Sequence, residues 1–153
     1  MADDAGTSTI ATNRRARFDF HLEDRFEAGM VLQGSEVKAL RNGTANLQDA
    51  FVSVKRDGVE LYNLHIPPYE MAGYAGHEPT RPRRLLLNKR EIDKLRKGTE
   101  VKGFTIIPTK MYFKGGRAKI EIALGKGKKS HDKRATIAER ESKRRLDRVL
   151  KER

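Results

Sequence analysis

Positive charge is distributed unevenly along this chain of 153 residues, and that distribution limits what its parts can fold into. Lys and Arg number 33 against 21 Asp and Glu, a formal net charge of +12. Residues 125–153 hold 12 of the basic and 5 of the acidic side chains. This stretch has few large aliphatic residues, so burial cannot offset the entropy of ordering it alone. We therefore expect a folded body followed by a basic tail that orders on a polyanionic partner.

The remainder of the chain has enough apolar material for one core. Hydrophobic residues make up 37% of the sequence and charged residues 35%. A body of roughly 120 residues closes a single hydrophobic core and hardly two. We expect a flexible leader over residues 1–12, a body over residues 13–124 and the tail over residues 125–153.

Alternation of apolar and polar residues predicts the strands of the body. The pattern predicts one strand around Phe18 to Leu22 and a second over residues 26–32. Two β-rich runs, 51–55 and 59–65, are separated by Arg-Asp-Gly, which favours a hairpin.

A last pair of strands is predicted over residues 105–113 and 118–124, joined through Gly115 and Gly116. Ile120, Ile122 and Leu124 would face the same way. Pro108 lies inside the first run, and because proline cannot donate to a strand pair it must fall at an edge or a bulge.

Capping signals predict two short helices between these strands. Ser35 can cap a helix that ends at Gly43. Asn88 and Glu91 form a capping box for a second helix ending at Gly98. Residues 67–84 contain four prolines and no sustained period, which indicates a long loop.

Six short strands with hairpin connections predict a mainly β fold. A closed antiparallel barrel of the oligonucleotide-binding type, with two or three short helices, would leave no unpaired strand edge. An open sheet with helices on one side is the alternative, because the order of strands cannot be obtained from one sequence.

The tail sequence predicts a helix that forms fully only when a partner binds. Thr136 and Glu139 form a capping box, and acidic residues precede basic ones by four positions. Without an apolar face, such a helix is marginal in water until phosphates screen its arginines. Upstream, glycines among lysines predict a flexible hinge, and the ring of His131 could stack on a base.

Sequence signals of catalysis, metal binding and membrane insertion are not found. The chain has no cysteine, its four histidines lack metal-ligand spacing, and the Gly-Lys-Gly-Lys-Lys-Ser run does not match a phosphate loop. No serine-hydrolase elbow occurs. We expect no enzymatic activity, no cofactor and no metal. With no apolar run typical of a signal peptide or a membrane span, we expect a cytoplasmic protein with no membrane partner.

Several blocks of residues in fixed order resemble the SsrA-binding protein family, also called small protein B. They are 13–17 (Asn-Arg-Arg-Ala-Arg), 26–29 (Phe-Glu-Ala-Gly), 34–38 (Gly-Ser-Glu-Val-Lys), 79–81 (Pro-Thr-Arg), 84–87 (Arg-Leu-Leu-Leu), 127–129 (Gly-Lys-Lys) and 131–134 (His-Asp-Lys-Arg). The resemblance runs from about Asn13 to Arg140 and covers most of the chain.

The resemblance implies a six-stranded barrel that binds the tRNA-like domain of transfer-messenger RNA (tmRNA). It implies delivery of that RNA to stalled bacterial ribosomes for trans-translation. Matching barrel positions are Asn13, Glu27 and Leu86, although Leu86 could equally be core. Charge adds three further barrel positions, Lys38, Arg81 and Arg84, and Arg14 of the first matching block is also expected to bind RNA.

In the family the tail occupies the small-subunit decoding centre and the empty mRNA channel. The matching ribosome-binding residues are Lys128, Lys129, His131, Asp132, Lys133 and Arg134. We expect a monomer, with elongation factor Tu an indirect partner through aminoacylated tmRNA. The alternative is a basic ribosomal protein or another structural RNA-binding barrel, which would have a similar composition.

Overall fold

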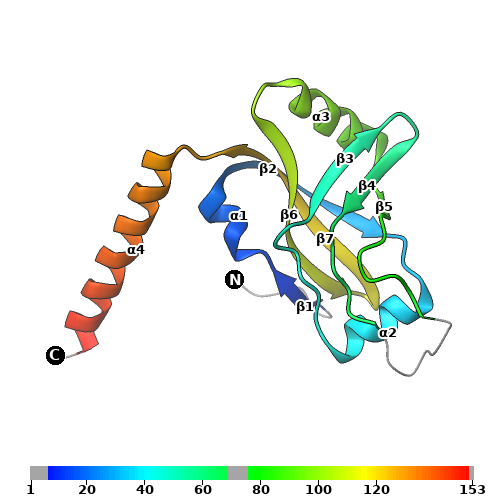
Figure 1. The fold of residues 1–153 in the computed structure, drawn as a ribbon, viewed down its shortest axis with the longest axis horizontal. Helices are drawn as coiled ribbons and strands as arrows, with labels where there is room; N and C mark the ends of the chain where they lie inside the picture. Colours follow the sequence, from blue (N-terminus) through cyan, green and yellow to red (C-terminus); the bar gives the residue numbers. More distant parts are fainter. Residues whose placement is uncertain (1–6, 69–75, 152–153) are drawn as a thin grey trace.

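A computed structural model describes residues 7–68 and 76–151; within α4 it does not describe the side chains of Ser130, His131, Asp132 and Thr136. Seven strands and four helices follow one another along the described chain (Figure 1). They are β1 (Thr7–Thr12), α1 (Arg14–Asp19), β2 (Phe20–Met30), α2 (Gly34–Asn42), β3 (Phe51–Lys55), β4 (Gly58–Tyr62), β5 (Arg83–Leu86), α3 (Lys89–Glu100), β6 (Phe104–Lys114), β7 (Arg117–Gly127) and α4 (Ser130–Lys151).

Six of the strands close into an antiparallel barrel. The order is β6-β3-β4-β5-β2-β7, and a further pairing of β7 with β6 completes the ring. This confirms the predicted fold class and answers the open-sheet alternative, because each strand of the ring has two neighbours. A seventh strand, β1, pairs with β6 outside the ring. Neither β1 nor β5 was predicted, and β5 begins at Arg83, inside the segment expected to be a loop.

Strand β6 is long enough to pair with two different strands along one edge. β3 pairs with β6 at Ile106, whereas β1 pairs with the other end of β6, from Lys110 to Lys114. Between these segments the β6–β7 register shifts after Pro108, so of the two positions predicted for this proline, an edge or a bulge, the structure shows a bulge. β1 also means that residues 7–12, expected in a flexible leader, are paired backbone.

The two strands predicted from Phe18 to residue 32 are one strand, β2. Phe18 itself belongs to α1, and β2 pairs with β7 from Phe20 to Gly29. Its register shifts between Glu23 and Arg25, where Asp24 has a positive φ of 29°. One inserted residue lets the strand bend around the barrel without ending, which sequence alternation alone does not reveal.

The barrel interior is filled by aliphatic residues of the strands, among them Ile120 and Ile122, which the alternation placed on one face. Leu61, Ile106, Ile120 and Ile122 are each fully buried. Leu95 of α3 is also fully buried and packs into the same core. The hydrophobic effect of this single core is the main stabilising contribution to the fold.

Helix α3 begins as predicted and ends later. The capping box of Asn88 and Glu91 is formed. Gly98 does not end the helix, which continues to Glu100. A Cβ at Gly98 would lie 2.4 Å from a methyl of Leu124, so this glycine allows the helix to approach β7 closely.

Helix α2 places a buried carboxylate at the centre of an ion-pair cluster. Its N-cap is Gln33 rather than Ser35, and Gly43 caps its C-terminus as predicted. Glu36 is fully buried and accepts from Arg83 Nε at 2.6 Å and from Arg81 Nη2 at 2.5 Å. Burial would raise the pKa of Glu36, but hydrogen bonds from Arg81, the Gln33 amide and Arg83 outweigh it and hold the pKa below its usual value. These two ion pairs hold residues 81–83 against α2.

The tail is a single helix that projects from the barrel (Figure 1). β7 extends to Gly127, three residues beyond the predicted end of the body, and Gly127 pairs with Phe20. α4 begins at Ser130, six residues before the predicted start at Thr136. The predicted flexible hinge is thus mostly strand. No helix in the described part of the chain is long and apolar enough to cross a membrane.

Candidate nucleic-acid interface

Adjacent strands of the barrel bring together a small mixed surface around Glu27. We call it the barrel patch and define it as Glu27, Leu86, Tyr112, Lys114 and Lys119. Glu27 of β2 accepts from the Tyr112 hydroxyl of β6, and Lys114 Nζ lies 3.4 Å from the same carboxylate oxygen. β7 runs between these two strands in the sheet.

The surroundings of Glu27 favour its charged form. The Tyr112 hydrogen bond lowers the pKa of Glu27 against a smaller effect of burial, and Lys114 and Lys119 lower it further. Burial, together with the nearby carboxylate, raises the pKa of Tyr112. The Glu27 side chain is 39% exposed. The patch therefore presents an oriented carboxylate between cations, which can accept from base amino groups while the lysines contact phosphates.

Leu86 lies on the surface of the barrel, and its alternative assignment to the core is wrong. It is 56% exposed. It pairs with Gly29 of β2, where an added Cβ would lie 3.4 Å from Leu86 Cβ and 3.6 Å from Lys119 Nζ. Leu86 and Lys119 are therefore neighbours across the sheet.

Tyr112, Lys114 and Lys119 were not predicted as site residues. They lie opposite Glu27 only because of the barrel register. A partial signal existed, because residues 110, 112 and 114 alternate with the apolar Met111 and Phe113 and so share one face of a strand. The sequence does not show which strand lies beside these three residues in the barrel.

The other predicted barrel cations make contacts within the protein. Arg81 is paired with buried Glu36. Arg84 donates to the Asp57 carbonyl, and its guanidinium occupies the space above Gly58 where a Cβ would lie. Lys38 is an exposed residue of α2. The structure brings none of these three into contact with Glu27, and their binding of RNA stays a prediction.

Asn13 has a structural position at the start of α1. Its side chain is buried, donates to the carbonyls of Pro108 (3.0 Å) and Leu47 (3.3 Å) and accepts from the Ala16 amide (3.3 Å). These bonds attach α1 to the barrel and hold exposed Arg14 next to it. A direct contact of Asn13 with RNA stays a prediction.

The start of the tail contacts α1. The Lys128 amide donates to the Asp19 carbonyl at 2.8 Å, and Lys133 Nζ lies 3.4 Å from a carboxylate oxygen of Asp19. Lys133 and Arg140 also lie over the Phe18 ring, 5.8 and 5.6 Å from its centroid. These contacts fix the direction in which α4 leaves the barrel.

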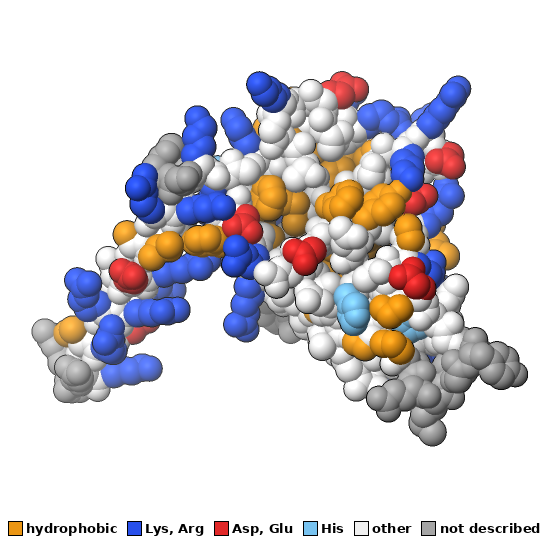
Figure 2. All heavy atoms as spheres, viewed as in Figure 1, with side chains coloured by type: hydrophobic (Ala, Val, Ile, Leu, Met, Phe, Trp, Pro, Cys, Tyr) orange, Lys and Arg blue, Asp and Glu red, His pale blue; other side chains and the backbone are white. Residues whose placement is uncertain are grey.

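The predicted ribosome-binding residues lie at this junction. Lys128 and Lys129 follow β7 directly, and Lys133 and exposed Arg134 lie in the first turns of α4. The side chains of His131 and Asp132 lie outside the described part of the structure, although their backbone belongs to α4. Figure 2 shows Lys and Arg side chains along much of the helix, interspersed with fewer acidic ones.

Within the described residues, no group of three or more His, Asp or Glu side chains is placed to hold a metal ion. Both surfaces are built from side chains that bind by hydrogen bonding, charge and stacking. Their geometry suits a ligand that carries phosphates and bases.

Comparison with known proteins gives a consistent result. The family model described as SmpB protein matches residues 10–152. An SsrA-binding protein of Thermobifida fusca (strain YX) is 53% identical over 97% of this chain and 92% of that protein. One of Halalkalibacterium halodurans is 53% identical over 94% of this chain and 93% of that protein.

A solved structure is also similar, with a TM-score of 0.68 and 41% sequence identity. The match covers 80% of this chain and 87% of that chain, and the structure is described as "tmRNA-SmpB: a journey to the center of the bacterial ribosome". The sequence match over nearly the whole chain and the shared fold agree with the barrel and tail described above, and the chain belongs to the SmpB family of SsrA-binding proteins.

Proposed function

We propose that this chain binds the tRNA-like domain of tmRNA through its barrel and delivers that RNA to stalled bacterial ribosomes for trans-translation. The observation that carries the proposal is the separation of two RNA-compatible surfaces on one chain. The barrel patch lies on a closed barrel, whereas the tail is a projecting basic helix. The relatives named SsrA-binding protein support it.

The barrel patch has the chemistry needed to capture a folded RNA. Glu27, held charged and oriented by Tyr112, accepts hydrogen bonds from base amino groups. Lys114 and Lys119 contact phosphates, and exposed Leu86 packs on the flat face of a ribose or base. An acidic residue within a basic surface favours bases over phosphate alone, so it contributes to selectivity.

The tail takes the place of pairing between a codon and an anticodon. A ribosome on a broken message has no codon in its decoding centre. His131 stacks on an rRNA base there, while Lys128, Lys129, Lys133 and Arg134 contact phosphates along the empty mRNA channel. The protein acts by binding alone, in the cytoplasm where ribosomes work, and makes or breaks no bond.

A competition titration tests this function. The full chain should shift the tRNA-like fragment of tmRNA on a gel in the presence of excess ordinary tRNA. It should also wash from ribosomes at high salt, because neutralising ~6 phosphates makes affinity fall steeply with salt. A chain that ignored the fragment and stayed on ribosomes at high salt would instead be a ribosomal protein.

A further inference from the structure

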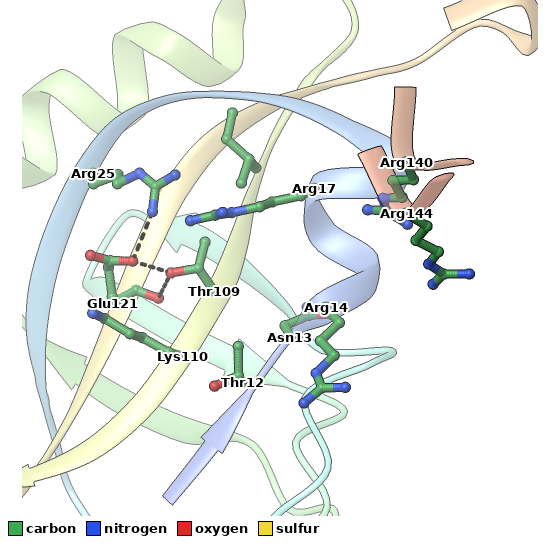
Figure 3. A pocket seen from close by; sticks show the side chains of 11 residues that line it. Thr12, Asn13, Arg14, Arg17, Arg25, Thr109, Lys110, Glu121, Arg140 and Arg144 are labelled. Carbon is green, nitrogen blue, oxygen red and sulfur yellow. Dashed lines mark hydrogen bonds and ion pairs between the residues drawn. The ribbon is translucent and has the colours of Figure 1, made fainter. Parts of the chain in front are cut away.

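A basic cleft lies between α1, the barrel wall and the tail helix. Its volume is about 440 Å³, and it is partly open to solvent. Three parts of the chain contribute its cations: α1, the strands β2 and β6, and α4 (Figure 3). These cations are Arg14, Arg17, Arg25, Lys110, Arg140 and Arg144.

Most of the positive charge in the cleft has no carboxylate partner. Glu121 is the acidic residue that lines it, and Glu121 is occupied by Arg25 Nη1 at 3.2 Å and by the Thr109 hydroxyl. Among the described residues, no carboxylate lies within ion-pair distance of Arg14, Arg17 or Arg144. Cations held together repel one another, and a bound anion relieves that repulsion.

The two walls of the cleft are held at a defined spacing. Arg140 and Lys133 of α4 lie over the Phe18 ring of α1, and Lys133 pairs with Asp19. Asn13 fixes the other end of α1 by donating to the Pro108 carbonyl of β6. Arg17 reaches from α1 toward the Arg25–Glu121 pair (Figure 3). The cleft is therefore built by α1, the barrel wall and α4 together.

We propose that this cleft binds a phosphodiester segment of RNA, clamped between the arginines of α1 and those of α4. Arginine suits this ligand, because its planar fork donates two parallel hydrogen bonds to phosphate oxygens. A strand fits better than a small free phosphate, because the cleft is open and continues along the basic α4 surface. The clamp deepens the proposed function, on which it rests, by assigning a site that couples bound RNA to the direction of the tail.

Paired substitutions on each wall test the clamp. One variant carries Arg14→Gln and Arg17→Gln, the second Arg140→Gln and Arg144→Gln, and a third combines all four. A matched control carries Arg90→Gln and Lys94→Gln, two exposed cations of α3. Affinity is measured by fluorescence anisotropy at several salt concentrations, once for the tRNA-like fragment of tmRNA and once for purified small ribosomal subunits. Thermal unfolding confirms that every variant folds.

The clamp predicts coupled losses. Both wall variants should lower affinity about tenfold for the same one of the two RNAs, and that RNA is the source of the segment. Each should reduce the salt slope by roughly 1.4, the value for two single-strand phosphate contacts. The combined variant should lose less than the product of the two separate losses, because both walls contact one segment. The control should stay within twofold of the unaltered chain.

Two results would overturn the clamp. If the loss of the combined variant equals the product of the two separate losses to within about twofold, the two walls make independent contacts and share no segment. Losses no larger than that of the control would show that the cleft binds neither RNA. If the unaltered chain fails to bind the tRNA-like fragment, the proposed function fails, and the small-subunit measurement alone then decides the clamp.

Discussion

The barrel and the tail helix use the same kinds of apolar side chain in opposite ways. Leu61 and Ile120 of the barrel are fully buried, whereas Leu146 and Leu150 of α4 are each 58% exposed. The barrel contains the interactions that determine its shape. The tail takes only its direction from contacts with α1, and its remaining side chains are left for a partner. The comparison teaches that the barrel offers a surface fixed by its own core, whereas the tail offers exposed side chains to a partner.

Removing the tail should produce the largest effect. A chain that ends at Gly127 keeps all of β7, including the pairing of Gly127 with Phe20. It should still shift the tRNA-like fragment on a gel, while tagging of stalled peptides falls to background. Tagging by the truncated chain at a normal level would show that the tail is not needed on the ribosome.

Within the barrel, the buried carboxylate should matter most for stability. Glu36→Gln leaves the fully buried Arg83 without its charged partner. Loss of one member of a buried pair costs about 3–5 kcal/mol of unfolding free energy. Urea unfolding measures it, with Glu139→Gln on the exposed tail helix as the matched control. A loss near that of the control would mean that Arg83 finds other partners.

The same carboxylate predicts how stability depends on pH. Its pKa is lower in the folded chain than its usual value of 4.5. Its contribution is therefore fully present above about pH 4.5 and is lost as pH falls through the folded pKa. The unfolding midpoint in urea should drop with acid in the unaltered chain and less steeply in Glu36→Gln. Parallel acid profiles would contradict this assignment.

A matched pair of leucines compares the two regions directly. Leu61→Ala should cost about 2–5 kcal/mol, because it leaves a cavity in a close-packed core. Leu146→Ala removes the same atoms from the tail helix and should change the unfolding free energy of the barrel by less than about 0.5 kcal/mol. Both values come from denaturant curves of the full chain. A large loss with Leu146→Ala would mean that the tail belongs to the folded core.

Single substitutions on the two surfaces should have the smallest effects and should separate by assay. Glu27→Ala should weaken capture of the tRNA-like fragment by about 1–3 kcal/mol, since it removes a base contact. His131→Ala should leave that affinity unchanged and impair accommodation on the ribosome, where stacking is worth roughly 1–3 kcal/mol per base. Unchanged RNA affinity with Glu27→Ala, or normal tagging with His131→Ala, would remove that residue from the mechanism.

Features set by local sequence could be predicted. The hairpin of β3 and β4, the capping box of α3 and the bulge after Pro108 are each specified by a few neighbouring residues. Features set by distant partners could not. β1 is a short polar segment that becomes a strand because half of the β6 edge is open to it.

The candidate site divides in the same way. Glu27 and the tail residues were found through contiguous blocks of sequence. Tyr112 and Lys119 join Glu27 only through the barrel register, and the engagement of Arg81 by Glu36 follows from the position of α2. Charge alone therefore predicted more free cations on the barrel than the fold provides.

The division of labour between barrel and tail is tested most directly by the selectivity of RNA binding. The affinity for the tRNA-like fragment is divided by the affinity for ordinary tRNA, first for the full chain and then for residues 1–127. We expect the two ratios to agree within about twofold, even if both affinities of the shorter chain fall with its lost charge. A ratio that drops to one on removal of the tail would contradict the account, because recognition would then reside in the helix.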